Sequence, residues 1–153
     1  MIIKTFELGR KDLLLSNLFL FYGENEGFKN QIIKNNFLER YKNNIHRYEE
    51  KEILENKNNF FNEIFSKSFF ENEKLIIISR VTDKIKDTIE EIIEKKIIDI
   101  KIILLARSLE KKSKIRNFFE KEKLLCCIPF YSDNSLTLSK IIDDFFRKKK
   151  IPI

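Results

Sequence analysis

Short apolar segments alternate with longer amphipathic ones along the chain, and this alternation limits the possible folds more than any other feature. Strand character is found at 18–22, 45–48, 75–79, 100–105 and 125–130. Helical periodicity covers about 27–41, 56–67, 83–96, 111–121 and 136–149. Runs as apolar as "LIII" and "IIDIKIILL" are typical of parallel strands with helices on both faces. We predict an α/β fold with a five-stranded, mainly parallel sheet.

The length and the ends of the chain suggest one cytoplasmic domain. A chain of 153 residues can bury one substantial core, and we assign residues 1–150 to it. The last residues, 151–153, are expected to begin a following domain. No signal peptide is evident, no apolar run approaches the ~20 residues of a membrane span, and the adjacent Cys126 and Cys127 do not form a secreted disulfide framework. We therefore expect a cytoplasmic location and no membrane partner.

The segment "FYGENEGFKN", residues 21–30, resembles the start of a phosphate-binding loop. A working loop reads G-x-x-x-x-G-K-[ST], and Gly23 and Lys29 fit its first glycine and its lysine. In a working loop the second glycine lets the backbone approach the phosphates closely, and here Phe28 stands in its place. Asn30 stands where a serine or threonine hydroxyl would bind magnesium. The pattern predicts a loop that no longer binds a nucleotide.

Other chemical signals are weak. The strand that should end in a magnesium-positioning acid is followed by Ser79 and Arg80. His46 is the only histidine, without ligand-spaced cysteines or histidines near it, so no metal site is predicted. We accordingly expect an AAA+/RecA-like P-loop-type fold without a cofactor and without catalytic activity of its own.

An aromatic segment, "FFNEIFSKSFF" at 60–70, offers a candidate binding surface. Phe61, Ile64 and Phe65 have helical spacing, and packing in the core explains them. Phe69 and Phe70 are adjacent at the end of this helix, so both cannot face one core. An exposed phenylalanine pair could anchor a partner protein, and the alternative is that the pair caps the core.

Basic residues gather near the start of the fourth predicted helix. The net charge is +6, which weakly favours an anionic partner. The candidates for facing DNA are Arg107, Lys111, Lys112 and Lys114. A solvated helix face also explains them, since charges of both signs alternate along most of the chain.

Three segments in order resemble the delta subunit of the bacterial DNA polymerase III clamp loader. They are "LFLFYGENEGFKNQIIKN", "IFSKSFFENEKLIIIS" and "IKIILLARSLEKKSKIRNFFEK". The likeness covers essentially the whole chain and implies an N-terminal AAA+-type domain that does not hydrolyse ATP. By position, Ser68, Phe69 and Phe70 would bind the sliding clamp, with Phe69 where the family commonly has leucine.

The resemblance implies a function based on binding. Such a domain inserts an apolar pair into the sliding clamp and favours the open ring during replication. Its partners would be the clamp (the beta subunit), other clamp-loader subunits, and DNA only within the assembled complex. Two alternatives remain open at this point: an active P-loop NTPase or kinase that uses Lys29, and a basic nucleic-acid-binding domain.

Overall fold

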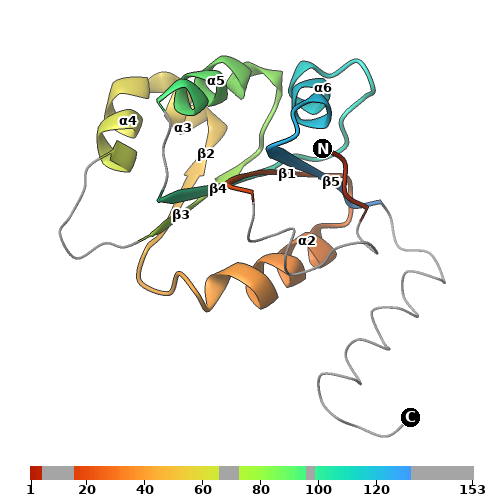
Figure 1. Cartoon of the computed structure of the whole chain (residues 1–153), viewed down its shortest axis with the longest axis horizontal. Helices are drawn as coiled ribbons and strands as arrows, with labels where there is room; N and C mark the ends of the chain where they lie inside the picture. Colours follow the sequence, from red (N-terminus) through yellow and green to blue (C-terminus); the bar gives the residue numbers. More distant parts are fainter. Residues whose placement is uncertain (5–15, 66–72, 96–98, 132–153) are drawn as a thin grey trace, which may run out of the picture.

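The fold is a five-stranded, all-parallel sheet with helices on both faces, which confirms the predicted α/β class (Figure 1). This computed structural model describes residues 1–4, 16–65, 73–95 and 99–131. The strand order is β2-β3-β4-β1-β5. The strands are β1 (Leu18–Tyr22), β2 (Ile45–Glu49), β3 (Lys74–Ser79), β4 (Ile100–Leu105) and β5 (Leu125–Pro129). Each strand lies within one residue of its predicted bounds at either end.

The central strands bury side chains on both faces, as continuous apolar runs require. Phe19 and Phe21 belong to the core on one face, whereas Leu18 and Leu20 belong to the core on the other. Cys126 and Cys127 are likewise both buried and belong to opposite cores. Two hydrophobic cores therefore hold the sheet between its helices.

The order of the strands decides which face each helix covers. From β1 the chain moves to the far edge of the sheet, and from β2 to β5 it returns in the opposite direction. Right-handed crossovers then place the first connecting helix on one face and the later helices on the other. In Figure 1, α2 (Glu26–Ile33) lies on one side of the sheet. The opposite side carries α3 (Glu50–Glu55), α4 (Lys57–Phe65), α5 (Lys86–Glu94) and α6 (Lys114–Lys121).

The first predicted helix, 27–41, is shorter and less regular than expected. It consists of α2, followed by the π-helical turn η2 (Lys34–Leu38). Ile33 and Phe37 point into the core, and the wider π-turn keeps Phe37 buried. The chain then reaches β2 through turns at 39–44.

The second predicted helix, 56–67, corresponds to α4, and a further short helix, α3, precedes it. The sequence analysis missed α3. A capping box begins α3: the Glu49 side chain accepts from the backbone of Glu52, whose side chain accepts from the Glu49 N–H. The predicted core residues Phe61 and Ile64 are buried.

The later helices agree more closely with the sequence. The region 83–96 forms a 3-10 turn, η3 (Asp83–Ile85), and α5 (Lys86–Glu94), with Ile89 and Ile92 buried. The next helix, α6 (Lys114–Lys121), begins three residues later than predicted because Ser113 caps it. The predicted helix at 136–149 and the residues 151–153 lie outside the described part of the chain. None of the described helices combines the length and apolar character needed to cross a bilayer.

Candidate functional site

The carboxyl edge of the sheet is where a ligand would be expected. In open parallel sheets, ligands bind outside the carboxyl ends of the strands, where neighbouring loops turn to opposite faces. Here the loop after β1 leads to α2 on one face, and the loop after β4 leads to α6 on the other. β1 and β4 are direct neighbours, so the switch point lies between residues 23–25 and 106–113.

Gly23 begins the loop after β1, and its backbone geometry requires glycine. Its φ is +118°, and a Cβ atom there would lie 2.0 Å from the carbonyl oxygen of Phe130. Its N–H donates to the carbonyl of Arg107 at 3.0 Å, while the Phe130 carbonyl accepts from the N–H of Asn25 at 3.2 Å. The loop therefore packs against its neighbours instead of opening around a phosphate.

Lys29, at the position of the phosphate-binding lysine, is almost completely buried, with 1% of its surface exposed. Its ammonium group donates to the carbonyls of Gly23 at 2.5 Å and Ala106 at 2.7 Å. It also contacts the carboxylate of Glu26 at 2.8 Å. An ammonium group has three N–H donors, and these three contacts satisfy all of them.

The start of α2 is also satisfied from within the chain. The side chain of Asn25 caps the helix by accepting from the Phe28 N–H at 3.1 Å. The Phe28 ring packs edge-on against Phe130 at a centroid distance of 5.5 Å, so it fills space beside the core. Asn30, at the magnesium-binding position, is exposed on α2. The four sequence-predicted loop residues are thus brought together, in an arrangement that serves folding.

No protein-family model matches this sequence, and no curated protein matches it either. The comparisons therefore assign no family, and the likeness to delta subunits remains a prediction. Function is inferred below from the geometry of the carboxyl edge.

A pocket of about 950 Å³, here called the carboxyl-edge pocket, opens beside this loop. It is lined by the ends of β3 and β4, the start of η3, the loop 106–113 and the first residue of α6. Three of the four candidate DNA-facing cations line it, namely Arg107, Lys112 and Lys114, and all are exposed. Lys111 is exposed too but does not line the pocket.

Sequence reasoning missed Arg80 as a partner of these cations. It follows β3 and has a left-handed backbone with φ of 55°, which is uncommon for a residue other than glycine. Its side chain is 81% exposed, with one loose contact of 3.9 Å to Glu49. Because β3 pairs with β4, Arg80 and Arg107 follow adjacent strands and line the same pocket. Only the strand order reveals this proximity.

Asp83 fixes one wall of the carboxyl-edge pocket. Its carboxylate accepts from the Ser113 hydroxyl at 2.7 Å and from the Ile115 N–H at 3.0 Å. Slight burial raises the pKa of Asp83, but the hydrogen bonds from Ser113 and from the Ile115 and Lys114 backbone outweigh it and leave the pKa below its usual value. This ionised side chain ties η3 to the start of α6.

A buried carboxylate, that of Glu50, fixes the preceding turn. It lies in the first turn of α3 and accepts from both the N–H and the hydroxyl of Thr82, each at 2.8 Å. The turn that carries Arg80 and Asp83 is thereby attached to α3 as well as to β3. The wall of the pocket is held at several points.

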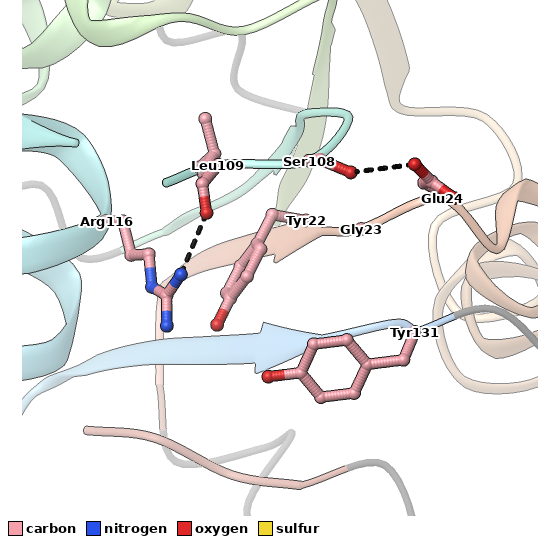
Figure 2. Close-up of a pocket in the computed structure, with 7 residues that line it drawn as sticks. All are labelled: Tyr22, Gly23, Glu24, Ser108, Leu109, Arg116 and Tyr131. Carbon is pink, nitrogen blue, oxygen red and sulfur yellow. Dashed lines mark hydrogen bonds between the residues drawn. The ribbon is translucent and has the colours of Figure 1, made fainter. Parts of the chain in front are cut away.

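A smaller pocket of about 150 Å³, here called the tyrosine pocket, also borders the loop 106–113, at Ser108 and Leu109 (Figure 2). Tyr22 and Tyr131 line it with Arg116, whose guanidinium lies 4.9 Å from the centre of the Tyr22 ring and donates to the Leu109 carbonyl. Burial, above all, raises the pKa of the Tyr22 phenol above its usual value.

The predicted clamp-binding residues Ser68, Phe69 and Phe70 lie outside the described part of the chain. The residues that flank them are described. Phe65 ends α4, and Lys74 begins β3 and donates to the Glu63 carbonyl at 3.2 Å. Lys74 is the first residue of β3, so it lies at the amino edge of the sheet, opposite the carboxyl-edge pocket.

The described residues contain no group of three or more histidine, cysteine or acidic side chains arranged to hold a metal ion. His46 lies on the edge strand β2, as expected for a structural residue, and its Nε2 is buried. The lining of the carboxyl-edge pocket offers cations, carboxylates and hydroxyls to a ligand.

Proposed function

We propose that this chain is a nucleotide-silent AAA+-like domain that binds a DNA polymerase sliding clamp, as the delta subunit of a bacterial clamp loader does. In this proposal Phe69 and Phe70, next to Ser68, enter a pocket on the clamp and favour its open ring. The domain catalyses no reaction itself. Other loader subunits would consume ATP, and DNA would be contacted only in the assembled complex.

The observation that supports the silent site is the position of Lys29. Its three donors are taken by Gly23, Glu26 and Ala106, so a phosphate would have to displace three protein acceptors from a buried ammonium. Breaking such charge-assisted bonds without replacement is costly. The alternative of an active NTPase or kinase needs this lysine to be free, and the geometry disfavours it.

The clamp-binding part of the proposal depends on the sequence. The pair lies in sequence between Phe65, the last residue of α4, and Lys74, the first residue of β3. An apolar pair of this kind suits an interface hot spot, in which a few side chains supply most of the binding energy.

The test is binding of the whole chain to the sliding clamp of the same organism, by isothermal titration calorimetry. The Phe69→Ala, Phe70→Ala double variant should lose about 2–4 kcal/mol or more of binding free energy while keeping its melting temperature. Leu124→Ala is the matched control, because Leu124 is a highly exposed apolar residue before β5. No binding by the unmodified chain would refute the proposal, and a double variant that unfolds would place the pair in the core.

A further inference from the structure

We propose that the carboxyl-edge pocket docks an acidic peptide segment of a second partner protein. This inference goes beyond clamp binding, which is proposed for Ser68, Phe69 and Phe70 and not for the residues that line this pocket. It is carried by the exposed cations of the pocket, its fixed backbone floor and the residue types of its lining.

The carboxyl-edge pocket has more positively charged side chains in its lining than negatively charged ones. Among the described residues, Arg107 has no ion-pair partner, the Lys114 side chain interacts with Asp83 only through electrostatic attraction, and Arg80 has only the loose contact with Glu49. Each acidic residue of the lining has a partner in the domain: Glu26 contacts Lys29, Asp83 accepts from Ser113, and Glu110 lies 3.3 Å from Lys112. The remaining field is positive, and it favours an anionic occupant.

Backbone hydrogen bonds between neighbouring strand ends build the floor of the pocket. The Val81 N–H donates to the Leu105 carbonyl at 3.0 Å, and the Ala106 N–H donates to the Phe21 carbonyl at 2.9 Å. Asp83 and Glu50 fasten the wall, as described above. A site whose backbone is already ordered loses little conformational entropy when a ligand binds.

The lining favours a peptide over a nucleic acid. None of the residues that line the carboxyl-edge pocket is aromatic, so bases of a single strand would have no ring on which to stack. Arginine pairs with carboxylates in a bidentate way, and Arg80 and Arg107 present guanidinium groups at two points of the rim. The partly exposed apolar side chains of Leu105 and Leu109 also line the pocket and suit the aliphatic stems of glutamate side chains.

Fluorescence anisotropy with a labelled peptide tests the proposal directly. The probe is a repeating Glu-Ser peptide of about ten residues, and its neutral control is the repeating Gln-Ser peptide, both at about 50 mM salt, where screening is modest. A ten-nucleotide oligothymidine is the nucleic-acid arm. The variant is Arg107→Gln, Lys114→Gln, and its charge-matched control is Lys51→Gln, Lys123→Gln, at exposed positions outside the pocket.

We expect the chain to bind the Glu-Ser peptide in preference to the Gln-Ser peptide, and the pocket variant to weaken binding at least about tenfold. The control variant should stay within about twofold. Absence of binding, or an equal loss in both variants, would overturn the proposal. Tighter binding of oligothymidine that is lost in the pocket variant would also overturn it, in favour of a nucleic-acid site.

Discussion

The ammonium group of Lys29 lies 2.7 Å from the carbonyl oxygen of Ala106, 77 residues further along the chain. This contact ties α2 to the end of β4, on the opposite side of the switch point. A lysine that would hold phosphate in a working loop thus holds two loops of the protein together. The first prediction follows from this relationship.

Replacing Lys29 with methionine should destabilise the fold. The carbonyls of Gly23 and Ala106 would lose their donor in a buried site, at a cost of about 2–4 kcal/mol in the free energy of unfolding. Urea denaturation measures this loss, and Lys51→Met on the surface of α3 is the control, with an expected change below about 0.5 kcal/mol. An unchanged free energy of unfolding in Lys29→Met would contradict this structural role of Lys29.

Magnesium-ATP should leave the melting temperature of the unmodified chain unchanged at about 5 mM nucleotide. A ligand that binds only the folded state raises stability by mass action, so an unchanged melting curve reports the absence of appreciable affinity. A clear upward shift would revive the NTPase alternative. The same titration on Lys29→Met would then show whether this lysine is involved.

The two glycines of the loop region form a matched pair for a second stability test. Gly23→Ala would place a Cβ atom 2.0 Å from the Phe130 carbonyl at a positive φ, and we expect a loss of about 3 kcal/mol or more. Gly27→Ala lies in α2, where the nearest atom to the new Cβ is 3.9 Å away. Alanine is the better helix former, so this variant should be neutral or more stable by up to about 1 kcal/mol. Equal effects of the two changes would be inconsistent with the structure.

Asp83 should contribute a specific pH dependence. The pKa of Asp83 is lower in the folded state than the unfolded value of 3.8. Its contribution to the free energy of unfolding is therefore present above pH 3.8 and is lost as the pH falls through the folded pKa. Asp83→Asn should therefore lower the free energy of unfolding by about 1 kcal/mol near pH 7. The difference in this free energy between the variant and the unmodified chain should become smaller towards about pH 3. Urea denaturation across this range measures it, and a gap that stays constant would show that the charge of Asp83 is not involved.

The cysteines should be unreactive in the native state. Burial raises the pKa of the Cys127 thiol to about 12, and Cys126 is also completely buried. Neither should react with a thiol reagent at about pH 8 until the protein opens, whereas both should react at once in denaturant. Rapid modification of the folded chain would mean that the sheet beside β5 is accessible.

The sequence by itself determined the strands, the parallel sheet and the absence of an intact phosphate-loop motif. Strands buried on both faces need continuous apolar runs, and those runs are local signals that neighbouring residues carry. Dependence on local signals also explains why the sequence analysis missed α3. A short capped helix has too few turns for its periodicity to be evident.

Only the tertiary structure decided what Lys29 contacts and which cations share a pocket. Ala106 reaches Lys29, and Arg80 lies near Arg107, because β4 pairs with both β1 and β3 in the sheet. The order of strands depends on packing across the whole chain and on the right-handed crossovers, and no local pattern specifies it. The physical reason is that a binding site at the carboxyl edge is assembled from loops that are distant in sequence and adjacent only in the folded sheet.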